Sequence, residues 1–461
     1  MGKTELISLI VWNFLAYICY SVIVPFLPLE FDHLGLDVII YGYIFAMYAF
    51  ALMTGALIVG KMLPIFGRKF ILIAGLTSMG FAMIAFGFIV YWKSTALLIA
   101  VSLAIRGLQG FSSSMIQTTS YAIVAIVYKD NQQKYLGLLE SSQGIGLVAG
   151  PAIGSGLYSL FGFQYTFYGV GGIFLILAPC LYLVIPQSVN KNDERSGSIM
   201  SNLSMHSAHN TLVDQEENAD NTNSSSNNKE TISVREPIKY YQVFFRPIFF
   251  ITSICSFLSC FWFSYTEPVM SLRLDEFHLS SAVIGIFFSI APFMYTISSL
   301  SVSWMADKVD SKKLILIGLV SNGLSQFMVG PSSFLPDSLI IMWFGQLFHG
   351  FTLCLFLITW LPVMIDDAVE AFPKRKIEVT NISPVIFNSM LGTGQMLGPI
   401  YGSNITNFLN FRIWTDVIGV VNLLYFVAYL LVWKGWSSKV NSQLNDSSKD
   451  ETDKLLVDKS S

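Results

Sequence analysis

The ten residues GLVAGPAIGS at 146–155 return in near-copy as GQMLGPIYGS at 394–403. Glycine and proline are the poorest formers of a helix interior, yet both copies lie within apolar runs. Each copy has three glycines spaced by four residues, so they share one face of a helix: Gly146, Gly150, Gly154, Gly394, Gly398 and Gly402. Small residues placed in this way let a neighbouring helix backbone approach closely, and Pro151 or Pro399 bends the helix. A static packing seam is the alternative, but the repeat favours two related halves whose helices rock against their neighbours.

The composition around these stretches predicts a membrane protein. The chain has 461 residues, of which 53% are hydrophobic and 12% charged, and its mean hydropathy is +0.58. A soluble globular protein carries about 25% charged residues, and runs of about 20 apolar residues can cross a ~30 Å hydrocarbon core. We predict twelve spans near residues 5–28, 39–62, 70–92, 96–126, 136–160, 165–186, 247–270, 282–305, 313–335, 338–365, 382–408 and 413–434. Backbone groups in lipid must bond internally, so the fold class is an all-α membrane protein.

The positive charges predict the orientation in the membrane. Arg106 lies inside a span, and Lys93, Arg273 and Arg412 fall on one side of the membrane. The other Lys and Arg residues fall in the termini and the even-numbered connections. Both termini and the central loop are therefore expected in the cytoplasm. The first span lacks a small-residue cleavage site after it, which favours a retained helix over a removed signal peptide.

Other features argue against several classes of function. All five cysteines lie in apolar spans, which favours small core residues over disulfides or a metal site. The net charge of −3 gives no indication of nucleic-acid binding. No loop carries a nucleophile–base, metal-ligand or phosphate-binding pattern, so we do not expect an enzyme.

The chain divides into four segments. Residues 187–243 include the polar run NADNTNSSSNNKE and are expected to form a disordered cytoplasmic loop. This loop separates an N-terminal six-helix bundle (1–186) from a C-terminal one (244–435), and a flexible cytoplasmic tail (436–461) follows. The bundles resemble each other: CYSVIVPFLPLE in the first span corresponds to WFSYTEPVMSLR in the seventh. In transporters with such repeats, the substrate site lies between the halves.

Two motifs resemble those of the major facilitator superfamily. The first copy of the glycine pattern is similar to the antiporter motif of that superfamily's exporters, with Ser155 in place of the last Gly. The segment RGLQG at 106–110 is similar to the superfamily's span-four motif. The resemblance implies twelve transmembrane helices in two pseudo-symmetric six-helix bundles.

A third motif matches the superfamily only in part. Gly60, Gly67 and Arg68 resemble the motif between spans two and three, but Pro64 stands where an Asp is usual. The second half keeps that acid as Asp307 and lacks the Gly and Arg. The resemblance therefore implies only part of the charge relay that would assist gating.

A closer resemblance covers nearly all of the transmembrane sequence. The segments CYSVIVPFLPLE, LLESSQGIGLVAGPAIG and YTEPVMSLRL are similar to the vesicular amine transporter family, solute carrier family 18. The segment around Glu140 favours the branch that contains the vesicular polyamine transporter. The resemblance implies proton-coupled antiport of organic cations, amines or polyamines, into an acidic vesicle or vacuole. The proton gradient would drive it without a cofactor, and we expect a monomer.

Three ionisable side chains lie within predicted spans: Arg106, Glu140 and Glu267. Each costs roughly 2.5–3.5 kcal/mol or more in mid-membrane, so each is expected to have a functional or structural role. Glu267 precedes Pro268 and matches the Glu of the family's Glu-Pro segment, which implies contact with the cation. Its position toward the lumenal end of the span leaves an interfacial residue as the alternative.

Glu140 and Asn388 occupy equivalent places in the two halves. Glu140 stands ten residues before Gly150, and Asn388 stands ten before Gly398. In monoamine-carrying relatives, the residue that matches Asn388 is an Asp tied to transport, so the acid has moved to the other half here. We favour a role for Glu140 in substrate or proton coupling. An acid near the cytoplasmic mouth is the alternative.

Arg106 is always charged and needs an internal partner, for which Glu140 on the next span is the natural candidate. A structural ion pair, or a network with Gln109, is the alternative to a coupling role. His349 corresponds to Gln109 in the second half, and a lone His in an apolar span is more often a hydrogen-bonded packing residue. Three aromatic residues could bind an amine by cation–π contacts or simply pack: Trp262, Tyr265 and Trp360.

These residues suggest a mechanism. A carboxylate removed from water favours its protonated form, so one site can hold a proton when it faces an acidic lumen and an ammonium when it faces the cytosol. Each pH unit supplies about 1.4 kcal/mol per exchanged proton. Two alternatives stay open: a carrier of anionic or neutral solutes anchored on Arg106, and a receptor or scaffold without transport. Only the altered loop motif, with Pro64 and Asp310, favours the scaffold.

The C-terminal segment resembles a sorting signal. Glu451 stands four residues before Leu455 and Leu456, which resembles the dileucine signal that clathrin-type adaptors bind, although so short a pattern often occurs by chance. We therefore expect a multi-pass protein of a vesicle, lysosome or vacuole. Its other expected partners are a small organic cation and membrane lipid.

Overall fold

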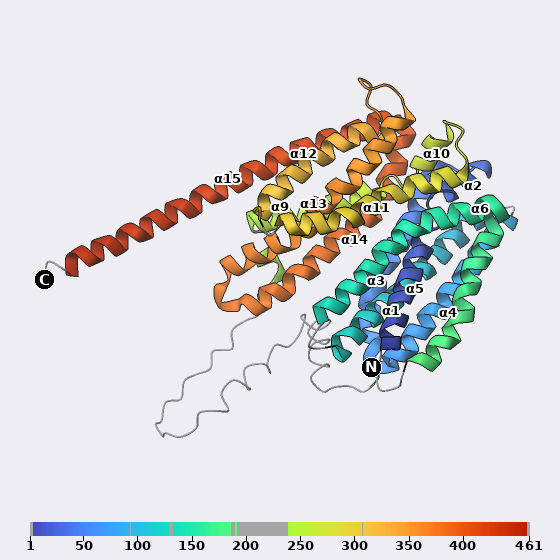
Figure 1. The fold of residues 1–461 in the computed structure, drawn as a ribbon, viewed down its shortest axis with the longest axis horizontal. Coiled ribbons are helices and arrows are strands. Elements are labelled where there is room, and N and C mark those ends of the chain that lie inside the picture. The colour runs from blue at the N-terminus through green and yellow to red at the C-terminus, as the bar shows by residue number, and fades with distance from the viewer. Residues whose placement is uncertain are drawn as a thin grey trace.

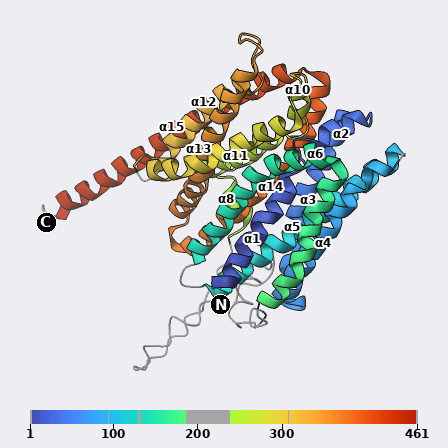
Figure 2. The same cartoon turned by 45° about the vertical axis from the view of Figure 1, so that its right-hand side comes forward.

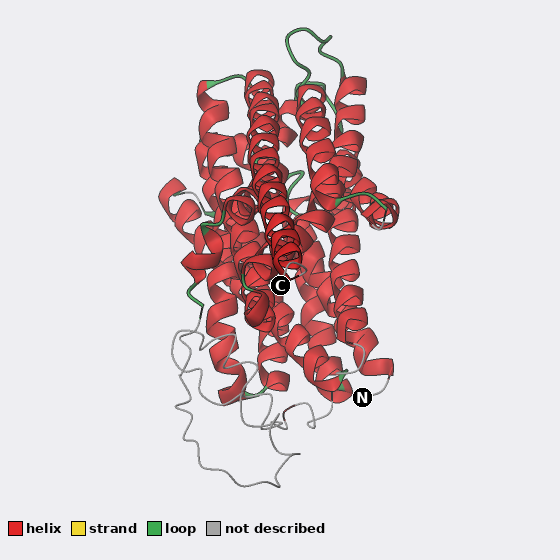
Figure 3. Cartoon of the chain, turned by 90° about the vertical axis from the view of Figure 1, so that its left-hand side faces the viewer, coloured by secondary structure: helices red, strands yellow, loops and turns green. Residues whose placement is uncertain are grey.

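The computed structural model describes residues 3–92, 94–128, 132–185, 190, 238–306 and 308–458. Over these ranges the chain consists of helices and connecting segments and has no strand (Figure 3). The first half comprises α1 (Lys3–Ser21), α2 (Leu27–His33), α3 (Val38–Phe66), α4 (Arg68–Gly87), η1 (Ile89–Tyr91), α5 (Thr95–Val127) and α6 (Gln132–Val184). The second comprises α8 (Tyr240–Phe244), α9 (Pro247–Ser264), α10 (Met270–Asp275), α11 (Ser281–Ala306), α12 (Ser311–Val329), α13 (Leu339–Ala371), η4 (Pro373–Arg375), α14 (Lys376–Phe408) and α15 (Phe411–Asp458).

The membrane-length helices match the predicted spans. Within the described ranges, nine helices are long and apolar enough to cross a membrane. One of them, α6, contains two spans, because Gly162 has a non-helical backbone with φ 81° and ψ 179°. Helices α12 and α14 have the necessary length and a more polar sequence. With these included, the prediction of an all-α protein with twelve spans is confirmed.

The helices form two halves, α1–α6 and α8–α15, which lie side by side (Figure 1). The halves contact each other mainly where α14 packs on α3 and where α11 packs on α6. Figures 1 and 2 show the halves converging where α2 and α10 lie and diverging toward the N-terminus. We call these two ends of the molecule the α2–α10 side and the N-terminal side.

The repeated glycines lie at equivalent helix contacts in the two halves. A Cβ atom added at Gly146 or Gly150 would overlap α1, and one at Gly154 would overlap Val22, directly after α1. In α14, the same atom at Gly394 or Gly398 would overlap α9, and one at Gly402 would overlap Tyr265, directly after α9. Gly150, for example, lies against Ser21, and Gly398 lies against Ser264. The prediction that these stretches let a helix backbone approach closely is therefore confirmed for both halves.

The proline and the final serine of each repeated stretch contact the opposite half. Ser155 and the carbonyl of Pro151 pack on Gly285 of α11, and Ser403 and the carbonyl of Pro399 pack on Gly42 of α3. Ser403 Oγ also donates a hydrogen bond of 3.5 Å to the carbonyl of Ile39. Each repeated stretch thus presents its glycines to its own half and its Pro-Ser face to the other.

The structure describes the first-half residues of the motif between spans two and three, but not Asp307 of the second half. Gly60 lies within α3, where an added Cβ would meet nothing within 4 Å. Gly67 ends that helix with φ 80°, and Arg68 begins α4 and is buried. Asp307 and Lys93 lie outside the described residues.

Two predicted boundaries need correction. The linker was expected to reach residue 243, but the backbone N–H of Ile238 donates to Glu378, and α8 begins at Tyr240. The tail was expected to be flexible, but α15 continues to Asp458 and projects beyond the other helices (Figure 1). Residues 436–458 contain no Gly or Pro that would stop a helix.

Candidate functional site

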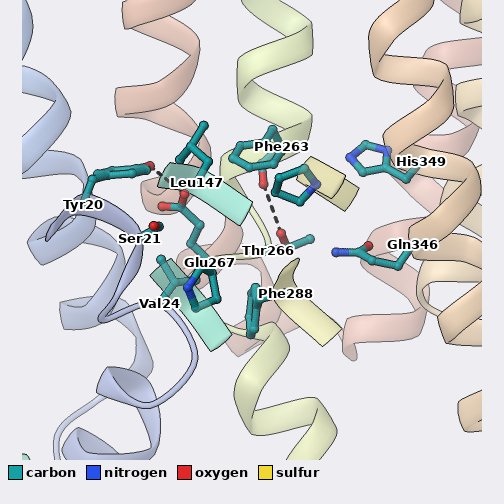
Figure 4. A pocket seen from close by; sticks show the side chains of 12 residues that line it. Tyr20, Ser21, Val24, Leu147, Phe263, Thr266, Glu267, Phe288, Gln346 and His349 are labelled. Carbon is teal, nitrogen blue, oxygen red and sulfur yellow. Dashed lines mark hydrogen bonds between the residues drawn. The ribbon is translucent and has the colours of Figure 1, made fainter. Parts of the chain in front are cut away.

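A small pocket lies between the two halves (Figure 4). Twelve residues line it. They include Tyr20 and Pro151 of the first half and Glu267, Phe288, Gln346 and His349 of the second. Its volume is about 30 Å³, which is the space of roughly one water molecule. Among the residues that line it, Glu267 is the one carboxylate.

Glu267 is placed by a break in the helix. Helix α9 ends at Ser264, three residues before Glu267, and the following Pro268 has no backbone N–H with which to continue it. Helix α1 ends in the same way at Ser21, ahead of Pro25, so the two breaks are equivalent in the two halves. The side chain of Glu267 is only 4% exposed. The structure therefore places Glu267 inside the protein, between the halves.

The Glu267 carboxylate is bound by a residue of the opposite half. The hydroxyl of Tyr20 on α1 donates a hydrogen bond of 2.6 Å to Oε1 of Glu267 (Figure 4). Both side chains are buried. Because the donor and the acceptor belong to different halves, any separation of the halves at this point must break the bond.

Arg106 lies behind Tyr20, fully buried in the first half. Its guanidinium donates to Gln109 Oε1 at 3.0 Å and to the carbonyl of Ile44 at 3.4 Å. It also lies over the ring of Tyr48, 4.7 Å from the ring centre, and the Tyr48 ring is 4.9 Å from that of Tyr20. A continuous chain of contacts therefore joins the positive Arg106 to the negative Glu267.

The expected pairing of Arg106 with Glu140 is wrong. Arg106 stands 21 residues before Val127 at the end of α5, about 30 Å along the helix axis. Glu140 stands eight residues after Gln132 at the start of α6, only about 12 Å from that end. Since α5 ends where α6 begins, the two side chains differ in depth by roughly 20 Å. The sequence pattern placed Arg106 and Glu140 on adjacent spans, but it did not show how far each side chain lies along its helix.

Glu140 is exposed and lies near the N-terminal side. Its electrostatic neighbours are Tyr121 of α5 and Tyr295 of α11. Tyr295 belongs to the second half, so Glu140 is within electrostatic range of both halves, but it does not line the pocket. Asn388, its counterpart on α14, is also exposed and does not line the pocket.

The aromatic candidates are packed in the core of the second half. Trp262, Tyr265 and Trp360 are each at most 1% exposed, and none of them lines the pocket. His349 is hydrogen-bonded, as expected, but it also lines the pocket.

Sequence reasoning missed three residues of this region. They are Tyr20 and Tyr48, which connect Arg106 to Glu267, and Gln346, which lines the pocket. Tyr20 lies within the quoted segment CYSVIVPFLPLE, and Gln346 lies one helical turn before His349. Helical spacing from a known polar residue was the signal that could have found Gln346.

Two related helical halves with a pocket between them are the architecture of membrane transporters with internal repeats. The sequence model described as Major Facilitator Superfamily matches residues 9–376 and 250–457, and the chain belongs to that superfamily. It is 24% identical to the MFS-type transporter SLC18B1 of Mus musculus, over 96% of this chain and 89% of the relative. The human SLC18B1 protein is also 24% identical, over 92% of this chain and 86% of the relative. These similarities support the expected relation to solute carrier family 18.

Solved transporter structures share the fold. The nucleoside transporter NupG superposes with a TM-score of 0.68 at 12% sequence identity, covering 94% of this chain and 100% of that one. A bacterial homologue of the human lysosomal transporter Spinster gives a TM-score of 0.67 at 13% identity, covering 94% and 98%. At such low identity these structures establish the fold alone.

Proposed function

We propose that this protein exchanges protons for organic cations and that Glu267 is the site for which they compete. The observation that carries the proposal is the burial of Glu267 in the pocket between the halves, bound to Tyr20 of the opposite half. A buried carboxylate without a direct ion pair gains from binding either a proton or an ammonium. Competition for one carboxylate couples the two fluxes.

The two halves supply the movement. In the proposed cycle, the halves separate alternately on the N-terminal side and on the α2–α10 side, as in other transporters with repeated halves. The structure has the halves together on the α2–α10 side, and its pocket holds only about one water molecule. A cation therefore needs the halves to part before it can reach Glu267.

Glu140 has a separate role in this proposal. It is exposed near the N-terminal side, which the positive charges of the sequence assign to the cytoplasm. A carboxylate there would attract cations toward the pocket before they reach Glu267. A polyamine long enough to reach both carboxylates would gain from each of them.

The alternative of an anion carrier receives less support. Arg106 does not line the pocket, and its guanidinium already contacts Gln109, Ile44 and Tyr48. An anion would have to displace these contacts and also approach Glu267.

The test is amine uptake into proteoliposomes with an imposed pH gradient, acidic inside. We expect Glu267→Gln to abolish gradient-driven uptake, because Gln can neither release a proton nor pair with an ammonium. Glu30→Gln is the matched control. Glu30 also accepts a hydrogen bond from a tyrosine, Tyr158, at 2.9 Å, but both residues belong to the first half. Uptake by Glu267→Gln at the parental rate would refute the proposal.

We also propose that the protein resides in the membrane of an acidic vesicle, lysosome or vacuole, with both termini in the cytoplasm. The support is the relation to SLC18B1 and the acid-dileucine pattern at Glu451, Leu455 and Leu456. These residues lie on the projecting end of α15. Truncation after Gly435 should leave uptake intact and change stability by less than about 0.5 kcal/mol, but should move a fluorescent fusion from vesicles to the cell surface. A truncated fusion that stays in vesicles would contradict the sorting role.

A further inference from the structure

A groove lies on the outer face of the first half, away from the pocket between the halves. Ile73, Thr77 and Phe81 of α4 line one wall. Four residues of the second span of α6, from Leu175 to Tyr182, line the other. The volume of the groove is about 610 Å³, within the roughly 300–1,000 Å³ of pockets that hold small ligands. Figures 1 and 2 show both helices on the side of the first half that is remote from the second.

The groove runs along the two helices for almost the depth of one bilayer leaflet. Ile73, Thr77 and Phe81 are four residues apart, so they follow one face of α4 over about 12 Å. Half of the hydrocarbon core of a membrane is about 15 Å thick. Apart from the hydroxyl groups of Thr77 and Tyr182, the side chains that line the groove are hydrocarbon. Such a groove fits a hydrocarbon chain that lies parallel to the helices.

A buried lysine stands at the end of the groove on the N-terminal side. Lys69 precedes Ile73 by one turn of α4, and its Nζ lies 4.1 Å from the centre of the Tyr182 ring, which lines the groove. Lys69 is only 8% exposed. Within the part of the chain that the structure describes, no carboxylate forms an ion pair with it. A buried ammonium without an acidic partner is costly, so an anion at this end of the groove would be stabilising.

The second half has an acid at the equivalent place, and the first half does not. Lys312 at the start of α12 corresponds to Lys69, and its backbone N–H donates to Asp310 at 2.7 Å. Gly67 takes the place of that acid in the first half, and the first turn of α4 contains no acidic residue. The Lys69 N–H is instead bound by the neutral side chain of Asn190 at 3.0 Å. Because a helix N-terminus itself favours negative charge, the start of α4 favours an anion from outside the chain.

We propose that this groove binds an anionic phospholipid of the leaflet on the N-terminal side, which the positive charges of the sequence assign to the cytoplasm. One acyl chain lies between α4 and the second span of α6, and the phosphate pairs with the ammonium of Lys69. The occupant is a lipid and not a soluble anion, because the positive charge stands at the end of an apolar groove on the outer face of a membrane protein. The site is separate from Glu267 and does not depend on the proposed exchange.

The test measures lipid binding to the purified full-length protein by native mass spectrometry. Dioleoyl phosphatidylglycerol and dioleoyl phosphatidylcholine are the probes, since they share their acyl chains and differ in net charge. One basic side chain near a membrane surface favours an anionic lipid by about fivefold, so we expect Lys69 to contribute this factor in favour of phosphatidylglycerol. Glycerol phosphate has the charge without the acyl chains and should not displace the lipid.

Substitutions at Lys69 assign the preference to this site. Lys69→Gln should weaken binding of phosphatidylglycerol by about fivefold and leave binding of phosphatidylcholine unchanged. Lys69→Arg retains the positive charge and should retain the preference. Lys312→Gln, at the equivalent position of the second half, is the matched control and should bind both lipids as the parent does.

A substitution in the wall tests the groove without changing any charge, and it also covers the case in which Lys69→Gln fails to fold. Thr77 is half-buried in the wall of the groove, so the ring in Thr77→Phe would fill the space and should weaken binding of both lipids several-fold. Ile176→Phe adds a ring to the same span of α6 at an exposed position that does not line the groove. It should leave binding of both lipids unchanged.

Several results would overturn the assignment of an anionic lipid to this groove. Equal binding of the two lipids by the parent would remove the role of charge, and a preference that persists unchanged in Lys69→Gln would place the lipid elsewhere. Binding that Thr77→Phe leaves unchanged would exclude the groove. Displacement of phosphatidylglycerol by glycerol phosphate would indicate a site for a free anion, and displacement by an equal concentration of cholesterol would indicate a sterol site.

Discussion

Tyr20 of the first half and Glu267 of the second form a buried hydrogen bond between the two halves. Their hydrogen bond is 2.6 Å long and buried, and it lies on the wall of the pocket. Hydrogen bonds to a charged partner contribute about 1.5–3 kcal/mol, enough to shift an equilibrium between two arrangements of the halves by tenfold or more. In the proposed exchange, a ligand that binds Glu267 would compete with Tyr20 and so weaken this connection. Occupancy of the site and separation of the halves would thereby be linked.

Removal of the Tyr20 hydroxyl should uncouple these two events. Tyr20→Phe keeps the ring against Tyr48 but loses the bond to Glu267. Because the halves then separate more readily without a ligand, we expect a several-fold faster proton leak in the absence of amine, measured with a pH-sensitive dye inside proteoliposomes. Tyr158→Phe removes a comparable bond, to Glu30 within one half, and should leave the leak unchanged. Equal leaks in the two variants would contradict the linkage.

The repeated glycine helices are the elements that determine how closely each half can pack. The first span of α6 lies on α1, and α14 lies on α9, and the repeated glycines lie at close contacts between them. In lipid, helices associate through packing and not through burial from water, so these contacts carry much of the cohesion within a half. The two prolines of these stretches, Pro151 and Pro399, lie inside helices α6 and α14.

Two glycines of α6 provide a matched pair of variants. A Cβ at Gly150 would overlap Ser21, whereas a Cβ at Gly156 would meet nothing within 4 Å. We expect Gly150→Ala to destabilise the protein by about 1–3 kcal/mol through overpacking. Gly156→Ala should be neutral or stabilising by up to about 1 kcal/mol, because Ala favours a helix more than Gly does. Thermal unfolding in detergent measures both, and equal midpoints would contradict the packing seam.

At the scale of the whole molecule, the halves meet through small residues, the hydrogen bond from Tyr20 to Glu267 and the longer one from Ser403 to Ile39. Gly285 receives Pro151 and Ser155, and Gly42 receives the equivalent pair from α14. The contacts at Gly285 and Gly42 are closely packed and involve no charged side chain, so they can separate without breaking an ion pair. This is the type of interface that alternating access requires.

A methyl group at this interface should affect transport more than stability. Gly285→Ala would overlap the first half, and the overlap is relieved when the halves separate. The strain of about 1–3 kcal/mol therefore shifts the conformational equilibrium instead of unfolding the protein. We expect uptake to fall about tenfold while the unfolding midpoint stays near that of the parent, and Gly144→Ala, where no atom lies within 4 Å, should be neutral. A large loss of stability in Gly285→Ala would show that the halves do not separate there.

The sequence by itself determined the twelve spans, the two related halves and the tight glycine contacts, and it made Glu267 a candidate site residue. Lipid imposes length and hydropathy on every span separately, so these features can be recognised residue by residue. Only the tertiary structure decided which side chains meet: Tyr20 binds Glu267, Arg106 contacts Gln109 and not Glu140, and His349 faces the pocket. Such pairings depend on the rotation and the depth of each helix relative to its neighbours, and the hydropathy of a span constrains neither.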